Sequence, residues 1–181
     1  MSHSYENAPH SKYFLEINTQ PDLTKVIDIM EFILNKFGQS SDLPHSKFTR
    51  IHFHCLMFHL IAELDTKKWS NTVASLMSGS KIAAKQACGF EFNDENSDQE
   101  LESLIEFRMV HTRDEQNNIL FKIDENKYAK FNLSKPVIEF SRGNIRFSFT
   151  PVLVCKQPSK TVGLGDAISS SGVIYSEFNF N

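Results

Sequence analysis

This chain has almost no excess of charge of either sign. Its 181 residues carry 19 lysines and arginines against 22 aspartates and glutamates, which gives a formal net charge of -3 and a pI near 6.2. A field this weak does not draw in nucleic acid or an anionic membrane, so any recognition of a phosphate must be local. We therefore expect no nucleic-acid partner.

Long apolar runs are also lacking. Residues 1–20 form a polar segment without the basic start and apolar stretch of a signal peptide, and no run is long enough to cross a bilayer. We expect no membrane span, and the sequence carries no visible address for a compartment.

Cysteine is scarce. Cys55, Cys88 and Cys155 cannot all pair with one another within the chain, and they lie far apart without the spacing of metal ligands. Buried free cysteines behave as small apolar residues, so we expect three buried free thiols.

Apolar side chains are abundant, at 40% of the residues with sixteen phenylalanines. This is enough for the packed core of one globular domain, and the phenylalanines are best interpreted as core. Apolar residues at three-and-four spacing predict a helix over 21–37 that ends at Gly38, and alternation predicts a strand over 50–55. Residues 56–64 fit either a buried strand or the start of a helix, and we favour the strand.

The second half of the chain carries weaker patterns. Residues 69–88 predict a helix with a break near Ser78 and Gly79, and the polar run 93–102 predicts a peripheral surface loop. Residues 137–149 predict a hairpin, and 152–155 a further strand. A final helix is indicated by apolar side chains at Ala167, Ile168, Ile174 and Phe178.

Three histidines invite a metal interpretation. Alternate residues of a strand share a face, so His52 and His54 could direct two imidazoles at one ion, with His59 close by in sequence. No nearby cysteine or carboxylate completes a ligand set. We favour half-buried histidines with one backbone partner each, and contact of one of them with a ligand is more plausible than a metal.

The residues 161–169, TVGLGDAIS, place a carboxylate just after two glycines, where a strand is expected to lead into a helix. Gly163 and Gly165 allow a close approach of the backbone to another group, and the first turn of a helix has unpaired amides that suit a phosphate. Asp166 would repel that phosphate, so it makes better sense as the acceptor of a proton from an attacking hydroxyl. A tight turn without function is the alternative, and neither a Walker A loop nor a dinucleotide fingerprint is present.

Several segments together carry a family resemblance. Residues 49–54 (TRIHFH), 149–156 (FTPVLVCK) and 161–169, in this order, resemble the ADP-dependent glucokinases, a branch of the ADP-dependent sugar kinase family. The resemblance runs from about Pro21 to the C-terminus and is weak over 92–132. It implies an α/β fold, a ribokinase-like three-layer sandwich, of which this chain is the C-terminal portion of the large domain without the sugar-binding lid. Residues 1–20 would be a separate polar segment, 21–181 the catalytic part, and 92–132 a variable insertion or loop.

The resemblance also implies a reaction. The β-phosphoryl group of ADP would pass to the 6-hydroxyl of glucose, leaving AMP and glucose 6-phosphate. Asp166 would be the general base and would contact Mg²⁺ through water, while the backbone amides of Gly163, Leu164 and Gly165 would hold the phosphoryl oxygens. The residues beside ADP would be His54, Cys55 and Val154; Cys55 replaces the threonine that we expect in the family.

Two parts of the family pattern are not recognisable, the Asn-x-x-Glu and His-x-Glu segments that organise Mg²⁺. Phosphoryl transfer without an ordered metal ion and a closed site should be slow. A truncated, non-catalytic protein that binds nucleotide or another protein is therefore the alternative function. Animal members of the family are associated with the endoplasmic reticulum through an N-terminal signal, and no such signal is visible here.

Overall fold

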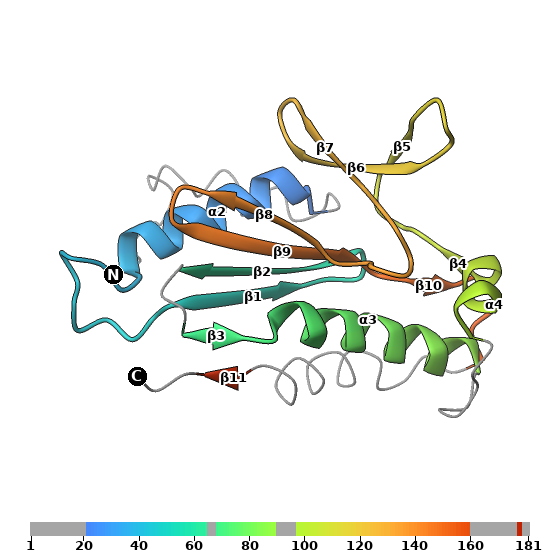
Figure 1. Cartoon of the computed structure of the whole chain (residues 1–181), viewed down its shortest axis with the longest axis horizontal. Helices are drawn as coiled ribbons and strands as arrows, with labels where there is room; N and C mark the ends of the chain where they lie inside the picture. Colours follow the sequence, from blue (N-terminus) through green and yellow to red (C-terminus); the bar gives the residue numbers. More distant parts are fainter. Residues whose placement is uncertain (1–20, 65–67, 90–96, 160–176, 179–181) are drawn as a thin grey trace, which may run out of the picture.

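A computed structural model describes residues 21–64, 68–89, 97–159 and 177–178 of the chain (Figure 1). Along the chain the elements are α2 (Leu23–Phe37), β1 (Arg50–His54), β2 (Phe58–Leu64), β3 (Trp69–Ser70), α3 (Thr72–Cys88), α4 (Ser97–Leu104), β4 (Ile105–Glu106), β5 (Thr112–Arg113), β6 (Ile119–Asp124), β7 (Lys127–Lys130), β8 (Ile138–Arg142), β9 (Ile145–Pro151), β10 (Val154–Cys155) and β11 (Glu177–Phe178). The described part is mixed α/β, and all of its strand pairs are antiparallel.

Helix α2 ends at Phe37 as the sequence predicts and begins at Leu23, two residues later than predicted. The carboxylate of Asp22 accepts hydrogen bonds from the backbone N–H of Thr24 at 2.8 Å and of Lys25 at 3.3 Å, which satisfies two amides of the first turn. At the other end the N–H of Gly38 donates to Leu34 O at 2.8 Å. A Cβ at residue 38 would lie 2.3 Å from that same carbonyl oxygen, so glycine is required there by close approach.

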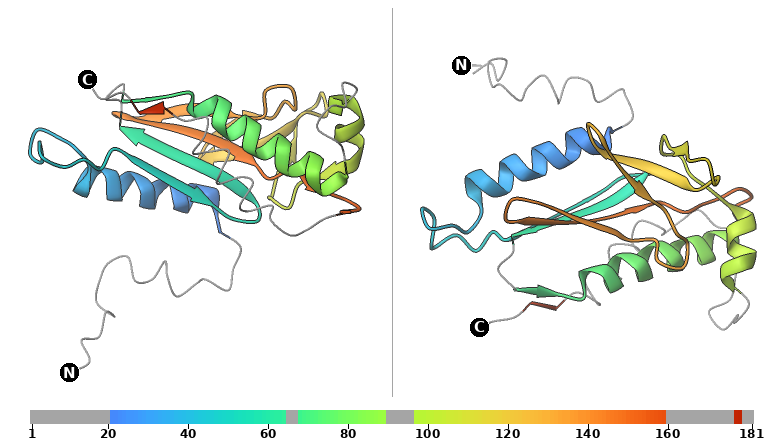
Figure 2. Two further views of the ribbon diagram at one scale, coloured as in Figure 1. Left: turned by 90° about the horizontal axis from the view of Figure 1, so that it is seen from below. Right: turned by 45° about the horizontal axis from the view of Figure 1, so that its top comes forward.

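The centre of the fold is a four-stranded sheet with the order β1-β2-β9-β8. The predicted strand over 50–55, the strand preferred for 56–64 and the hairpin over 137–149 are confirmed. Helix α2 lies on one side of this sheet and α3 on the other (Figure 2).

The register of the strands gives the sheet two unlike faces, because successive side chains point to opposite sides. The apolar face carries Ile51, Phe53, Phe58, Leu60, Ala62, Leu64, Ile138, Phe140, Ile145, Phe147 and Phe149, which pack with α2 in the main core, and also Pro151. Arg142, at the end of β8, is the charged exception on this face and forms ion pairs with Asp28 and Glu31 of α2. The polar face consists of Arg50, His52, His54, His59, Ile61, Glu63, Glu139, Ser141, Arg146, Ser148 and Thr150. On the polar face only Ile61 among these is aliphatic.

Helix α3 runs without interruption, so the predicted break near Ser78 and Gly79 is wrong. Gly79 and Ser80 are buried, and the hydroxyl of Ser80 donates to Pro151 O at 3.5 Å. The small residues allow the helix to pack closely on the sheet. This close packing, and not a break in the helix, explains why they occur here.

The peripheral loop predicted for 93–102 is wrong for its described part. Residues from Ser97 onward form α4, and Leu101 is fully buried with Ala84, Leu133 and Leu153 in a second cluster of core residues. The sequence did not predict this helix because its residues are mostly polar and only one of its leucines, Leu101, is buried.

Strands β5, β6 and β7 form a separate three-stranded sheet that extends away from the four-stranded one (Figure 1). Phe121 and Ile123 of β6 nevertheless pack into the main core. The sheet is therefore fixed to the rest of the molecule through β6.

The last described residues contradict the predicted final helix at Phe178. Strand β11 pairs with β3, placing Phe178 opposite Trp69 with ring centroids 5.0 Å apart in an edge-to-face contact. Edge-to-face stacking on an indole explains why this residue is extended. The other residues proposed for that helix lie outside the described residues.

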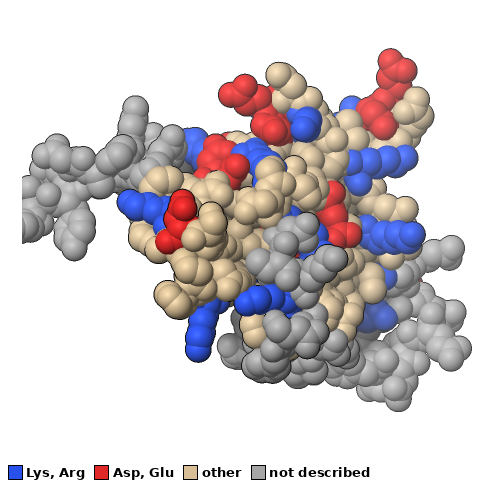
Figure 3. All heavy atoms as spheres, turned by 60° about the vertical axis from the view of Figure 1, so that its left-hand side comes forward, with Lys and Arg blue, Asp and Glu red and all other residues tan. Residues whose placement is uncertain are grey.

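Charges of both signs are interspersed on the face seen in Figure 3. Within the described ranges, no helix is both long and apolar enough to cross a membrane.

Candidate functional site

His54 and Cys55 lie where β1 turns into β2. The backbone N–H of Cys55 donates to Phe58 O at 3.0 Å, and its sulfur lies 3.6 Å from the same oxygen. The N–H of Met57 in turn lies 3.5 Å from that sulfur. The Cys55 side chain therefore shapes the turn, as a weak donor and a weak acceptor.

Val154 reaches the same end of the sheet from the other direction. The N–H of Val152 donates to Met57 O at 2.8 Å, which ties the chain after β9 to the β1–β2 turn. Val154 follows in β10, where it pairs with Glu106 of β4. The structure thus brings the segments of all three residues expected beside ADP to one edge of the fold.

The histidine cluster, His52, His54 and His59, lies on the polar face beside this turn. The three imidazole centroids are 5.8 to 6.2 Å apart, and the rings of His54 and His59 stack. His54 is exposed, whereas His59 is 1% exposed. A ligand at this edge would therefore meet His54 before the other two.

His59 has no hydrogen-bond partner at either ring nitrogen among the described residues. The predicted backbone partner is therefore wrong for His59, and the ring is fully buried rather than half-buried. Burial lowers the pKa of His59 to about 3 and that of His52 to about 4, and neighbouring positive groups add to the effect. Both rings are thus neutral at physiological pH.

In the part of the chain that the structure describes, no three histidine, cysteine or carboxylate side chains are arranged to hold a metal ion. The predicted Mg²⁺ contact of Asp166 and the anion hole of Gly163, Leu164 and Gly165 lie outside the described residues. Their roles remain predictions.

The described chain that leads toward Gly163 is held against the end of α3. Cys155 of β10 forms a disulfide with Cys88, with 5.4 Å between their Cα atoms. Beyond it, the N–H of Ser159 donates to Ala87 O at 2.8 Å. The expectation of free thiols is therefore wrong for Cys88 and Cys155, and only Cys55 is free.

A buried ion network lies at the opposite end of the polar face, and sequence reasoning missed it. Glu63 is 1% exposed and accepts a hydrogen bond from Arg146 at 2.7 Å and one from the hydroxyl of Thr72 at 2.5 Å. Arg50 lies 3.4 Å from the same carboxylate and 4.5 Å from the Trp69 ring centroid. The sequence did contain a clue to this network, because Glu63 lies inside the apolar run 56–64 and a buried acid requires partners.

This network joins four segments. Glu63 is in β2, Arg50 in β1, Arg146 in β9, and Thr72 in the first turn of α3. It fixes the start of α3 against the sheet, while the disulfide fixes its end.

Comparison with known proteins identifies relatives of this chain. A model of the ADP-specific phosphofructokinase/glucokinase conserved region matches residues 1–175. The chain is 37% identical over 171 residues to an ADP-dependent glucokinase of Bos taurus, covering 94% of this chain and 31% of that protein. It is 33% identical over 177 residues to a probable ADP-dependent glucokinase of Caenorhabditis elegans, covering 95% of this chain and 33% of that protein.

One solved structure that matches this chain is that of the last common ancestor of ADP-dependent phosphofructokinases from Methanosarcinales. It has a TM-score of 0.45 and 18% sequence identity, over 86% of this chain and 30% of that one. This chain spans about a third of the length of the curated relatives it matches. Because the family model covers almost all of its residues, the chain belongs to the ADP-specific phosphofructokinase/glucokinase family.

Proposed function

We propose that this chain forms the C-terminal portion of the catalytic domain of an ADP-dependent glucokinase, with the ribokinase-like sandwich of that family. Its reaction is transfer of the β-phosphoryl group of ADP to the 6-hydroxyl of glucose, which yields glucose 6-phosphate and AMP. The observation that carries this proposal is the 37% identity to a glucokinase over 94% of the chain.

The edge formed by the β1–β2 turn and β10 is proposed as the wall beside the nucleotide. His54 is exposed, and Cys55 and Val154 are half-buried, so all three can contact a base or ribose. Behind them His52 and His59 are neutral at physiological pH. The half-buried apolar side chains suit the adenosine part of ADP, while the phosphates need donors elsewhere.

Those donors are proposed to be the backbone amides of Gly163, Leu164 and Gly165, with Asp166 as the base that accepts the proton of the sugar hydroxyl. Amides held in place do not have to reorient when negative charge develops on the phosphoryl oxygens. The disulfide between Cys88 and Cys155 supports this assignment, because it holds the preceding strand in place.

Mg²⁺ would neutralise charge on the phosphates during transfer. The described residues supply no cluster of ligands for it, so none of them is assigned to the metal. Contact of Asp166 with Mg²⁺ through water is part of the proposal.

The test is glucose phosphorylation by ADP, comparing the parent protein with Asp166→Asn. Loss of a general base should lower turnover by about 10²–10⁴-fold while ADP affinity changes little. Asp42→Asn is the matched control, because Asp42 is an exposed carboxylate in the 39–49 connection. Turnover and ADP affinity are measured separately, by coupled assay and by calorimetry.

ADP binding without turnover in the parent would support the non-catalytic alternative. Turnover that survives in Asp166→Asn would remove the assignment of the base. A parent that neither binds ADP nor phosphorylates glucose would contradict the proposal as a whole.

A further inference from the structure

A cavity of about 930 Å³ opens between β4, the β5–β6 turn and the chain after β7. This volume lies within the range of small-molecule sites. His54, Cys55 and Val154, the described residues assigned to ADP, do not line the cavity. The cavity is therefore separate from the proposed nucleotide wall.

Aromatic rings form one side of this cavity. Phe107 contacts Phe131 edge to face with centroids 4.9 Å apart, and it contacts Phe121 and His111 at 5.7 and 5.9 Å. Phe121 is fully buried in the main core, so the ring cluster is firmly supported. These rings offer a fixed apolar surface to a ligand.

His111 adds a directed polar group. Its Nδ1 lies 3.0 Å from Met109 O, and because a carbonyl only accepts hydrogen bonds, Nδ1 carries the hydrogen. In the neutral ring Nε2 is then left as an acceptor.

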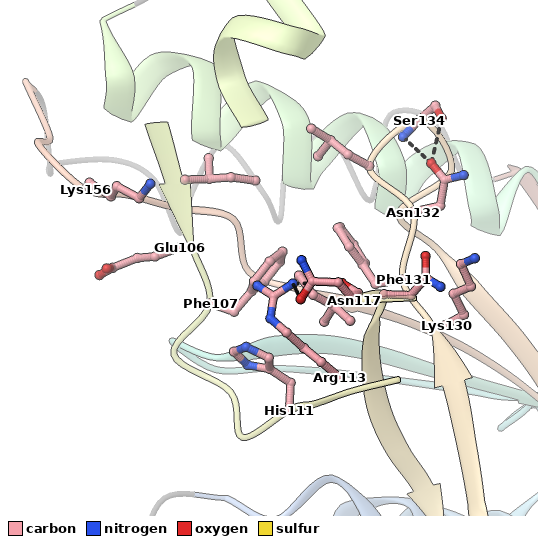
Figure 4. Close-up of a pocket in the computed structure, with 14 residues that line it drawn as sticks. Glu106, Phe107, His111, Arg113, Asn117, Lys130, Phe131, Asn132, Ser134 and Lys156 are labelled. Atoms are coloured by element: carbon pink, nitrogen blue, oxygen red, sulfur yellow. Dashed lines mark hydrogen bonds between the residues drawn. The ribbon is translucent and has the colours of Figure 1, made fainter. Parts of the chain in front are cut away.

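The charges around the cavity are mostly positive. Arg113, Lys130 and Lys156 line it against a single carboxylate, Glu106. Figure 4 shows Arg113 near the middle beside Phe107, with Lys156 and Glu106 at one end and Lys130 at the other.

Within the described ranges none of these three cations has a carboxylate at ion-pair distance. Arg113 donates through one terminal nitrogen to the backbone oxygen of Asn117 at 2.9 Å and to its side-chain oxygen at 3.3 Å. Lys156 donates to the backbone oxygen of Ser103 at 2.8 Å. These partners are neutral, so the charges of Arg113 and Lys156 remain available to an anion. Lys130 is close enough to the Asp114 carboxylate to help lower its pKa.

The turn that presents Asn117 is itself rigid. The carboxylate of Asp114 accepts hydrogen bonds from the backbone of Gln116 and Asn118 and from the Asn118 amide. The bond to the Asn118 side chain, with those from the backbone, lowers the pKa of Asp114. Arg113 precedes this turn and is oriented by it.

We propose that this cavity binds a small organic anion in which a ring or other apolar body carries a phosphate or carboxylate group. The anionic group lies against Arg113, whose remaining nitrogens have no partner in the described part, with Lys130 adding positive charge. The ring lies on Phe107 and Phe131. An inorganic anion would leave the rings uncovered, and a neutral ring would leave the cations unpaired.

Four probes separate these components: phenyl phosphate, benzoate, inorganic phosphate and phenol, each titrated into the protein by calorimetry. Phenyl phosphate or benzoate is expected to bind about tenfold or more tightly than inorganic phosphate and phenol, because only they use both parts of the cavity. The ratio between phenyl phosphate and benzoate identifies which anionic group the site prefers.

The double variant Arg113→Gln/Lys130→Gln should weaken the better probe about tenfold or more. Both residues are exposed, so the fold should be unaffected, which the thermal midpoint checks. The matched control is Arg108→Gln/Lys127→Gln, which removes two exposed cations from the same region outside the lining.

Equal losses in the two double variants would overturn the proposal, since binding would then depend only on overall charge. Equal affinities for phenol and phenyl phosphate, or no binding of any probe, would overturn it as well. The test uses neither ADP nor glucose, so its outcome is independent of the proposed kinase activity.

Discussion

The two faces of the four-stranded sheet differ in chemistry although the same strands form both. One face packs phenylalanines and aliphatic residues against α2, while the other carries histidines, charged residues and hydroxyls beneath α3. Apart from Arg142, which pairs with acids of α2, the apolar face requires only shape and volume, whereas each buried group of the polar face requires a partner. The comparison indicates that the apolar face contributes most of the stability, while the polar face fixes α3 in its place on the sheet.

The polar face is also incompletely satisfied. Ser148, 1% exposed, has no hydrogen-bond partner for its hydroxyl among the described residues, and His59 has none for its ring. A buried polar group without a partner costs free energy of folding.

The strongest test of the comparison uses two neighbours in β9. Phe149→Ala should destabilise the protein by about 3–5 kcal/mol, because Phe149 is fully buried between Phe58 and Phe121. Ser148→Ala, on the opposite face, should change stability by less than about 1 kcal/mol and can be stabilising, since the hydroxyl is unpaired. Urea unfolding measures both. Similar losses would mean that the two faces do not differ in this way.

A second test breaks the ion network. Glu63→Gln should cost about 2–3 kcal/mol, because it leaves Arg50 without its buried counter-charge while the amide keeps some hydrogen bonds. The loss is limited because the Arg146 side chain is 43% exposed. Glu139→Gln, an exposed acid on the same face, is the control. If both substitutions have equal effects on the urea midpoint, the network has no special role.

A third test changes pH. The pKa values of His52 and His59 are below the ordinary 6.5 in the folded protein, so the unfolded chain binds protons first as the pH falls. Stability is therefore complete above about pH 6.5 and decreases from there toward the folded values of about 4 and 3.

His59→Leu should remove up to about 2 kcal/mol of the loss between pH 7.5 and pH 5, measured by urea unfolding at each pH. His45→Leu is the control, since His45 is exposed in the 39–49 connection. An unchanged pH dependence in His59→Leu would show that His59 does not contribute to the acid sensitivity of the polar face.

Local sequence patterns predicted the helices and strands whose structure depends mainly on their own residues and little on tertiary contacts. The three-and-four spacing and Gly38 identified α2, and alternation identified β1 and the β8–β9 hairpin. Tertiary packing decided the rest. The small residues of α3 fit closely on the sheet instead of ending the helix, and Phe178 is extended because it stacks on Trp69.

The nucleotide wall came from the family resemblance and not from local patterns. The resemblance selected His54, Cys55 and Val154, whose contact with ADP stays a prediction, and the bond between Val152 and Met57 brings their segments together. The disulfide was missed because Cys88 and Cys155 are 67 residues apart, and only the fold shows that α3 ends beside β10. The network around Glu63 likewise depends on strand register, which periodicity alone does not provide.

The two attachments of α3 have a consequence for the chain between Ser159 and Glu177. Ser159 is bonded beside the last turn of α3, and Glu177 pairs with Ser70, just before its first turn. A helix of 17 residues is about 25 Å long. The length of α3 therefore sets the separation between the two points at which the segment with Asp166 begins and ends. Inserting or deleting one turn in α3 would change that separation by about 5 Å without altering any residue of the segment.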